Sequence, residues 1–319
     1  MKRKILITMG DFNGVGPEVT LKALQDKTLF GTLTPVLLGS RPILDFYAKR
    51  LKLENLLPKF EVIECAGEKE LRIQPGQISE QAGKMSALFL KKAIELANRC
   101  ESCAIVTAPI SKEALWMAGY RQYPGQTEFL AQGFGVGRFA MVLLSGRFRV
   151  GFVTTHQPIR EVASKISIDI IIDKVFAVVN DLKKYFGAAH PKLAMAALNP
   201  HAGEHGRLGT EEEKIIRPAV KQLIHKGIDI HGPFPADTLF TGIDQKNFDA
   251  YMVQYHDQGM IPIKMYGFGS AVNFTSGLPV PRTSPDHGTA FDIAGKGLAN
   301  AQSMKEAIRL AVQLASKKY

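Results

Sequence analysis

The sequence predicts an α/β protein built around a mostly parallel sheet. Short runs of branched and aromatic apolar residues alternate along the chain with longer segments whose apolar residues recur at helical spacing. This alternation is typical of parallel strands joined by helices. Two adjacent apolar runs are separated only by Ser145-Gly146-Arg147, which predicts a hairpin and therefore at least one mixed sheet. The length of 319 residues favours two domains.

The elements follow in chain order from the first strand and helix. The apolar run Ile5-Leu6-Ile7 predicts a strand, and Pro17 suits the first helical position because its missing N–H costs nothing there. Glu18 follows in the first turn, where the helix dipole favours a negative charge. Strands are expected at residues 4–8, 35–38, 61–63, 104–107, 139–144, 148–154, 192–197 and 250–253. Helices are expected at residues 17–24, 41–51, 79–98, 128–132, 168–184, 211–226 and 303–315.

The bulk composition excludes several classes of protein. The formal charge is +10, but basic residues are scattered and no basic run exceeds three residues, so we expect no nucleic-acid partner. The positive charge favours a small anionic ligand. No apolar run approaches the roughly 20 residues that span a bilayer. The start of the chain does not resemble a signal peptide, so we expect a cytoplasmic protein without a membrane partner.

Cysteine spacing gives only a weak signal. Cys100 and Cys103 form one C-x-x-C, and neither a second pair nor histidines at ligand spacing follow. The two thiols are either a redox pair or ordinary residues at the end of a helical segment.

A glycine-rich turn, Met9–Val19 (MGDFNGVGPEV), follows the first strand. Val19 occupies the third glycine position of a dinucleotide fingerprint, so that motif fails. A P-loop fails as well, because Val15 replaces its second glycine and Gly16 its lysine. On these residues alone, the turn is a strand–helix connection with ordinary glycines.

Three histidines, His156, His201 and His256, each follow an apolar run and precede a turn. Ligands of open α/β sheets bind beyond the carboxyl ends of strands. Three imidazoles at that edge predict a metal site with an open coordination position. The alternative is three separate structural or hydrogen-bonding histidines.

Further polar residues gather in the loop-rich sequence around His256. Asp237 lies in GPFPADTLF, and Lys264, Asn273 and Arg282 follow between prolines and glycines. Cations in such a stretch suggest an anion site. The alternative is a solvated loop.

Two distant motifs resemble one enzyme superfamily. Pro285–Asn300 (PDHGTAFDIAGKGLAN) resembles the adenine-side cofactor loop of isocitrate and isopropylmalate dehydrogenases, and GDFNGVGPEV resembles their first turn. More specifically, the chain resembles the 4-hydroxythreonine-4-phosphate dehydrogenase family. The similar segments are TAPISKEAL, GQTEFLA, TTHQPIREV, NPHAGEHGRLGTEE, GPFPADTLF, YHDQGMIPIK and VNFTSGLPVPRTSPDHGTAFDIAGKG.

The resemblance implies a two-domain, isopropylmalate dehydrogenase-like α/β fold with parallel and mixed sheets and an active site in the interdomain cleft. Residues 1–130 and 272–319 would form the cofactor-side domain. Residues 131–271 would form the domain for metal, substrate and dimerisation. The implied assembly is a homodimer whose active site lies near the interface, so that ligands come from two chains.

The resemblance also assigns residues. The metal ligands match His156, His201 and His256; zinc is expected, and cobalt, nickel, magnesium and manganese are alternatives. The substrate contacts match Thr127, Lys264, Asn273 and Arg282. Gln126 stands where the family usually has histidine, and its amide still donates to a phosphate but carries no charge. The cofactor residues match Gly14, His287, Gly288 and Asp292.

The implied cofactor is NAD, lying between the first turn and residues 286–297. The Asp292 carboxylate would accept from a ribose hydroxyl and repel a 2′-phosphate, which favours NAD over NADP. The implied reaction oxidises 4-hydroxythreonine 4-phosphate (4-phosphooxy-L-threonine) at C3. Decarboxylation then gives 3-amino-2-oxopropyl phosphate, in pyridoxal 5′-phosphate biosynthesis. Lys264 would hold a substrate anion during catalysis, and Asp237 would transfer a proton or orient a metal-ligating histidine.

Two alternatives remain open. The nearer is a sister dehydrogenase acting on 4-phosphothreonate, 4-phosphoerythronate or a dihydrodiol, which the Gln126 departure favours. The more distant is a zinc hydrolase with three histidine ligands and no nicotinamide.

Overall fold

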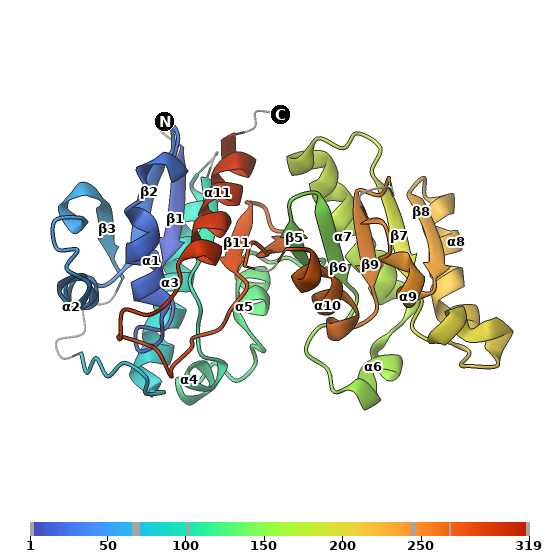
Figure 1. Ribbon diagram of the computed structural model, residues 1–319, viewed down its shortest axis with the longest axis horizontal. Coiled ribbons are helices and arrows are strands. Elements are labelled where there is room, and N and C mark those ends of the chain that lie inside the picture. The colour runs from blue at the N-terminus through green and yellow to red at the C-terminus, as the bar shows by residue number, and fades with distance from the viewer. Residues whose placement is uncertain (1–2, 66–70, 101–102, 244–246, 268, 317–319) are drawn as a thin grey trace. The chain divides into compact units, whose positions relative to one another are not determined.

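The computed structural model describes residues 3–65, 71–100, 103–243, 247–267 and 269–316 (Figure 1). The chain divides into two units. Unit 1 comprises Met1–Gly137 and Leu278–Lys318, and unit 2 comprises Arg138–Gly277. The predicted α/β class with parallel and mixed pairing is confirmed.

Unit 1 contains five parallel strands in the order β3-β2-β1-β4-β11. The strands are β1 (Lys4–Thr8), β2 (Thr34–Gly39), β3 (Glu61–Glu64), β4 (Cys103–Thr107) and β11 (Arg282–Pro285). The helices are α1 (Gly16–Leu24), α2 (Arg41–Leu51), α3 (Glu80–Asn98), α4 (Lys112–Met117), α5 (Gln126–Gly133) and α11 (Gln302–Ser316), with short 3₁₀ turns η1 (Lys27–Leu29) and η2 (Leu57–Lys59).

Burial on both faces explains the continuous apolar runs of the central strands β1 and β4. Helix starts follow local capping chemistry: Ser79 Oγ accepts the Ala82 N–H at 3.2 Å before α3. Pro17 lies in the first turn of α1, as expected from the sequence.

Unit 2 contains six strands in the order β10-β5-β6-β9-β7-β8. The β10–β5 and β5–β6 pairs are antiparallel, which confirms the predicted hairpin, and the other pairs are parallel. The strands are β5 (Ala140–Ser145), β6 (Phe148–Phe152), β7 (Lys192–Ala196), β8 (Asp229–Phe234), β9 (Ala250–Val253) and β10 (Val272–Ser276). The helices are α6 (Ile159–Lys165), α7 (Ile168–Phe186), η3 (Pro200–Gly206), η4 (Glu212–Ile216), α8 (Arg217–His225), α9 (Ala236–Leu239) and α10 (His256–Tyr266).

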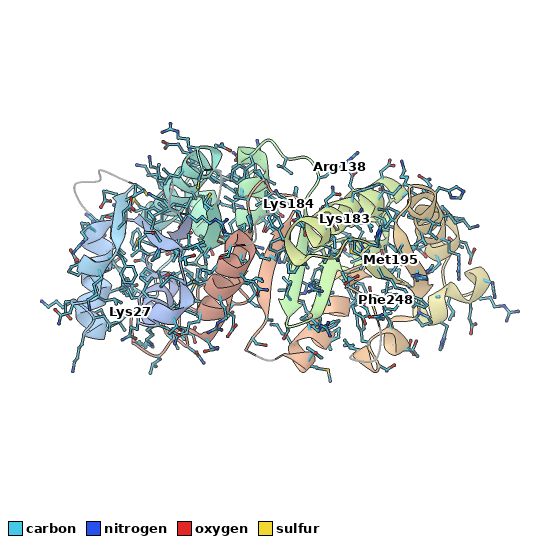
Figure 2. All side chains as sticks on the ribbon, turned by 90° about the horizontal axis from the view of Figure 1, so that it is seen from above. Lys27, Arg138, Lys183, Lys184, Met195 and Phe248 are labelled. Carbon is cyan, nitrogen blue, oxygen red and sulfur yellow. The ribbon has the colours of Figure 1, made fainter. Side chains whose placement is uncertain are left out.

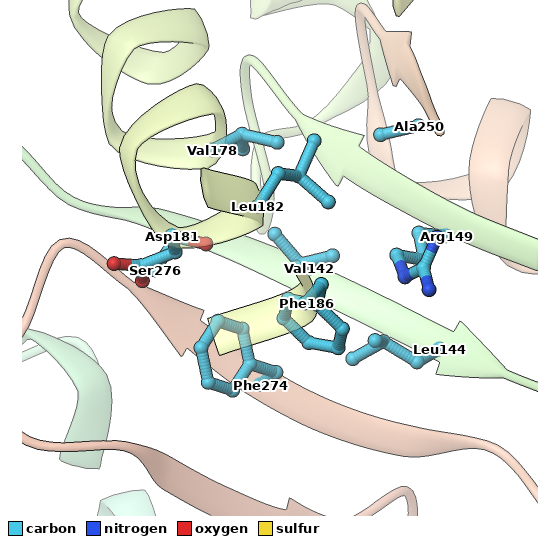
Figure 3. A pocket seen from close by; sticks show the side chains of 10 residues that line it. All are labelled: Val142, Leu144, Arg149, Val178, Asp181, Leu182, Phe186, Ala250, Phe274 and Ser276. Atoms are coloured by element: carbon cyan, nitrogen blue, oxygen red, sulfur yellow. The ribbon is translucent and has the colours of Figure 1, made fainter. Parts of the chain in front are cut away.

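Side chains fill the layers between strands and helices, while cations such as Lys27 and Lys183 are exposed (Figure 2). In unit 2, Phe148 and Phe152 of β6 pack with Ile263 of α10 in one apolar cluster. The alternating residue Arg149 contributes instead to a small cavity with α7 (Figure 3). Because successive side chains of a strand point to opposite faces, Phe148 and Phe152 face α10 while Arg149 faces α7.

The two units differ from the predicted domain limits at both boundaries. Helix α5 continues past residue 130, and unit 1 extends to Gly137. Strand β10, which was expected in the cofactor-side domain, pairs along its whole length with β5 and belongs to unit 2.

Candidate active site

Four adjacent parallel strands of unit 2 deliver polar residues to one edge of the sheet. Strands β6, β9, β7 and β8 lie side by side in that order. Beyond their carboxyl ends follow His156, His256, His201 and Asp237, respectively. The expected arrival of three histidines at one sheet edge is therefore confirmed, although their role as metal ligands stays a prediction.

His156 and His256 lie close together, with ring centroids 5.6 Å apart. Backbone hydrogen bonds from Val153 N–H to Val253 O and from Thr154 N–H to Gln254 O join the two strand ends that carry them. His256 Nδ1 lies 2.6 Å from Asp257 Oδ1. A carboxylate on one ring nitrogen directs the other toward a ligand, and this arrangement is common among metal-binding histidines.

His201 lies on a left-handed turn. Residues 201–205 all have positive φ, between 43° and 79°, and only Gly203 among them is a glycine. Each other residue costs roughly 1–2 kcal/mol in this conformation. Such strain persists only where neighbouring contacts hold the backbone, and it is concentrated at functional sites.

Within the described part of this single chain, no group of three or more histidine, cysteine, aspartate or glutamate side chains is arranged to hold a metal ion. The structure thus brings two of the three predicted imidazoles together and does not complete the set with His201. The paired imidazoles and Asp257 nevertheless have the donor chemistry of a zinc site.

A buried carboxylate that binds the backbone just before His201 was missed from the sequence. Glu212 is fully buried, and its Oε1 accepts the N–H groups of Leu198 and Asn199, each at 2.8 Å. The segment was expected to be an ordinary helix, whereas Glu212–Ile216 forms a π-helical turn. The two glutamates in GTEE were the available signal, but neither the π turn nor the burial of Glu212 can be read from spacing.

The three polar residues expected in loops lie on regular elements. Lys264 is exposed in the last turn of α10, and Asn273 lies on β10 with its Oδ1 buried and without a hydrogen-bond partner among the described residues. Arg282 belongs to β11. The loop interpretation was wrong for all three, because Pro262 is accommodated within α10 and β10 pairs with β5 despite the flanking glycines.

Arg282 is a buried cation in unit 1, only 1% exposed. Its Nε and Nη2 donate to Thr107 Oγ1 at 3.1 and 2.6 Å, and Nη1 donates to Thr127 Oγ1 at 3.2 Å. Burial lowers the pKa of Arg282 to about 10, and the negative charge of Glu128 partly opposes this shift. A guanidinium held by hydroxyl groups in a buried position is suited to binding an anion.

Gln126 begins helix α5 next to Thr127. Its Oε1 is buried and has no hydrogen-bond partner among the residues that the structure describes. A buried polar atom without a partner is costly unless a ligand or water satisfies it. The Gln126 amide oxygen is therefore available to a bound hydrogen-bond donor.

The first turn and the 286–297 loop touch each other directly. Val15 N–H donates to Thr289 O at 2.9 Å, and a Cβ at Gly14 would lie only 2.9 Å from Thr289 Cβ. The two segments therefore meet at Val15 and Thr289, and the expectation that a cofactor binds at these segments stays a prediction. His287, Gly288 and Asp292 are exposed on the loop.

An ion pair between a half-buried lysine and a buried glutamate of α1 fastens the end of this loop. Glu18 is fully buried and accepts the Ala299 N–H at 2.9 Å and the Gly297 N–H at 3.2 Å. Lys22 Nζ donates to Glu18 at 2.8 Å and to the Gly297 and Ala299 carbonyls at 2.8 and 2.7 Å. The negative charge that was expected to complement the helix dipole thus also holds the loop.

Asp11 is a second buried carboxyl missed from the sequence. It is fully buried in the first turn, and its Oδ1 accepts the Asn13 N–H at 2.9 Å. Burial raises the pKa of Asp11 to about 6, although backbone N–H groups of Asn13, Gly14 and Ser111 favour ionisation. The carboxyl therefore shapes the glycine turn.

Asp237 is exposed on α9, directly after β8.

No helix among the described residues is long and apolar enough to cross a membrane. The three cysteines are free thiols.

Comparison with known proteins extends over nearly the whole chain. The model of the family described as "Pyridoxal phosphate biosynthetic protein PdxA" matches residues 31–311. A 4-hydroxythreonine-4-phosphate dehydrogenase of Bacteroides thetaiotaomicron is 39% identical over 325 residues, covering 98% of this chain and 89% of that protein. A D-threonate 4-phosphate dehydrogenase of Salmonella typhimurium is 39% identical over 331 residues, covering 98% and 99%. The crystal structure of a 4-hydroxythreonine-4-phosphate dehydrogenase from Klebsiella pneumoniae has a TM-score of 0.86 at 36% identity and covers 99% of both chains.

Proposed function

We infer the function from one premise: the chain belongs to the family of the pyridoxal phosphate biosynthetic protein PdxA. The proposed enzyme is an NAD-linked, metal-dependent dehydrogenase that oxidises 4-hydroxythreonine 4-phosphate at C3. Loss of CO₂ then gives 3-amino-2-oxopropyl phosphate. The names of relatives along nearly the full chain support the substrate, and the sheet-edge histidines support the metal.

The buried guanidinium of Arg282 is the observation that carries the proposal. A dianionic phosphate or a carboxylate compensates a buried positive charge, and Arg282 is held in place by Thr107 and Thr127 before any ligand binds. Fixed donors of this kind bind an anion without reorganising at the moment of reaction. Thr127 and Gln126 add a hydroxyl and an amide to the same locality.

The metal would be held by His156 and His256, with His201 supplied by the second copy of a homodimer. The absence of a three-ligand group among the described residues of one chain supports this division of ligands. Zinc, or cobalt, nickel, magnesium or manganese in its place, would supply Lewis-acid chemistry toward the C3 hydroxyl. Asp257 orients the His256 ring, and Asp237, at the end of the neighbouring strand β8, is the proposed proton-transfer residue.

Lys264 and Asn273 are proposed to orient the substrate. Lys264 presents an ammonium from the last turn of α10 for a carboxylate or phosphate oxygen. Asn273 offers the buried Oδ1 that has no partner among the described residues, and a substrate hydroxyl or ammonium would satisfy it.

NAD, rather than NADP, is proposed to bind the surface formed by the first turn and the 286–297 loop. Gly14 permits the close contact with Thr289, and Gly288 has open space around the position that a side chain would occupy. His287 and Asp292 are exposed on the same loop, where an imidazole and a carboxylate suit the adenosine end of the cofactor.

Oxidation of D-threonate 4-phosphate is the second candidate. Several relatives carry that name, and Gln126 departs from the histidine that we expect in the family. This substrate has a hydroxyl where 4-hydroxythreonine 4-phosphate has an ammonium, and both compounds carry the phosphate that the neutral Gln126 amide would contact.

The test is an NAD-reduction assay with 4-hydroxythreonine 4-phosphate and D-threonate 4-phosphate, with and without chelator. We expect metal-dependent reduction with the first compound. Greater kcat/KM for the second would favour the sister activity. Reduction of NAD with neither compound, or full activity after metal removal, would refute the proposal.

A further inference from the structure

The carboxylate of Glu212 is surrounded by hydrogen-bond donors. Oε1 accepts the Leu198 and Asn199 N–H groups, and Oε2 accepts Asn199 Nδ2–H at 2.9 Å. These two residues connect the end of β7 to the left-handed turn that starts at His201. Glu212 is therefore attached to the backbone immediately before the proposed metal ligand.

The turn closes tightly around this carboxylate. A Cβ at Gly203 would lie 2.7 Å from Glu212 Oε2, and a Cβ at Gly209 would lie 2.3 Å from Asn199 Nδ2. Glu212 also begins the π-helical turn η4, a rare conformation that is frequent at functional sites. Two unusual backbone conformations, one π-helical and one left-handed, thus meet at a single buried side chain.

We propose that Glu212 is the positioning residue for His201: it holds the amides of Leu198 and Asn199 and thereby fixes the left-handed turn that presents the imidazole to the metal. This inference rests on the proposed function. Glu212 does not touch the metal or the substrate. Its effect passes through the backbone to His201.

The hydrogen-bond chemistry requires an acceptor-only group. All three donors point at the two carboxylate oxygens, so a glutamine of the same shape would place an NH₂ group against a donor. Asn199 does not relieve this conflict by rotating its amide, because Nδ2 also donates to Glu211 Oε2 at 2.7 Å. Glu212→Gln therefore perturbs the turn with almost no change in volume.

The experiment compares the full-length wild-type protein with Glu212→Gln, Glu212→Asp and His201→Ala. Glu211→Gln is the matched control, because it removes the same charge from the adjacent residue but leaves the Leu198 and Asn199 backbone N–H groups with their acceptor, Glu212. Zinc affinity is measured by competition with a chromogenic chelator. Amide hydrogen exchange is followed at residues 198–205, and circular dichroism checks the fold.

We expect Glu212→Gln to weaken zinc binding roughly 10–100-fold, the usual effect of losing a group that orients a metal ligand. Exchange at Leu198 and Asn199 should accelerate, while Glu211→Gln stays close to wild type in both measurements. If Glu212→Gln does not fold, Glu212→Asp decides, because it keeps the acceptor-only chemistry at shorter reach. A folded Glu212 variant with wild-type zinc affinity, or with wild-type exchange at residues 198–205, would overturn the inference.

The His201→Ala variant separates this inference from the proposed function. If wild type binds no zinc, or His201→Ala binds it as tightly as wild type, the metal site itself is wrong. If His201→Ala loses affinity and the folded Glu212 variants do not, only the positioning role of Glu212 is wrong.

Discussion

Asp181 makes the stability of unit 2 depend on pH. Its carboxyl lies on α7 at the cavity shown in Figure 3, is only 4% exposed, and accepts the Gly277 N–H at 2.9 Å. Burial raises the pKa of Asp181 from 3.8 to about 6, despite the hydrogen bond from Gly277. Asp181→Asn keeps an acceptor for that N–H and removes the ionisation.

The direction in which stability changes with pH follows from the protons that the folded and unfolded states bind. Between pH 3.8 and about 6 the folded Asp181 keeps a proton that the unfolded chain has lost, so stability falls as pH rises through this range. One pKa unit corresponds to about 1.4 kcal/mol, so the shift of about two units gives an upper bound of roughly 3 kcal/mol. The free energy of unfolding of Asp181→Asn should therefore rise relative to wild type by up to roughly 3 kcal/mol between pH 4 and pH 7.

Urea unfolding followed by circular dichroism at pH 4, 5, 6 and 7 measures this difference. Asp45→Asn, at an exposed position on α2, controls for the simple loss of a carboxylate. Because the comparison is made across pH, a constant offset from replacing a carboxyl by an amide does not matter. A difference between Asp181→Asn and wild type that stays constant from pH 4 to pH 7 would refute the reasoning.

Three further substitutions test the proposed sites. Gln126→His should lower the KM for 4-hydroxythreonine 4-phosphate, and more at pH 6 than at pH 8, because a protonated imidazole adds charge to phosphate binding; equal KM values at both pH values would remove Gln126 from the phosphate site. Arg282→Lys should lower kcat/KM roughly 10–100-fold, since charged hydrogen bonds are worth about 1.5–3 kcal/mol; unchanged steady-state kinetics would contradict the anion site. Lys22→Met should lower the free energy of unfolding by roughly 3 kcal/mol, because it leaves Glu18 buried without its cation. The same variant should weaken NAD binding in a fluorescence titration. Wild-type NAD affinity would show that the ion pair of Glu18 and Lys22 does not support the cofactor surface.

The sequence predicted elements well wherever local patterns were strong. The limits of β1 and α2 agree with the expected residues, because an uninterrupted apolar run and a clear helical period define them. Helices α4, α6, α9 and α10 and strands β8, β10 and β11 were missed. They are short or contain glycine and proline, and tertiary pairing overrides those local signals.

The candidate site also has features that local patterns predict and features that only tertiary packing determines. The approach of His156 and His256 could be predicted, because the carboxyl ends of neighbouring parallel strands share one edge. The roles of Glu212 and Asp11 could not. Their burial depends on how the loops close over them, and this closure leaves no period in the sequence.

The division of the chain into units has a consequence for biosynthesis. Unit 2 is one uninterrupted stretch, whereas unit 1 needs β11 and α11 from the far end of the chain. During translation at roughly 5–20 residues per second, unit 2 emerges complete while the β4 edge of unit 1 still lacks its parallel neighbour. An unpaired edge is open to aggregation. The half of the chain that is synthesised first therefore completes its sheet only after the last segment leaves the ribosome.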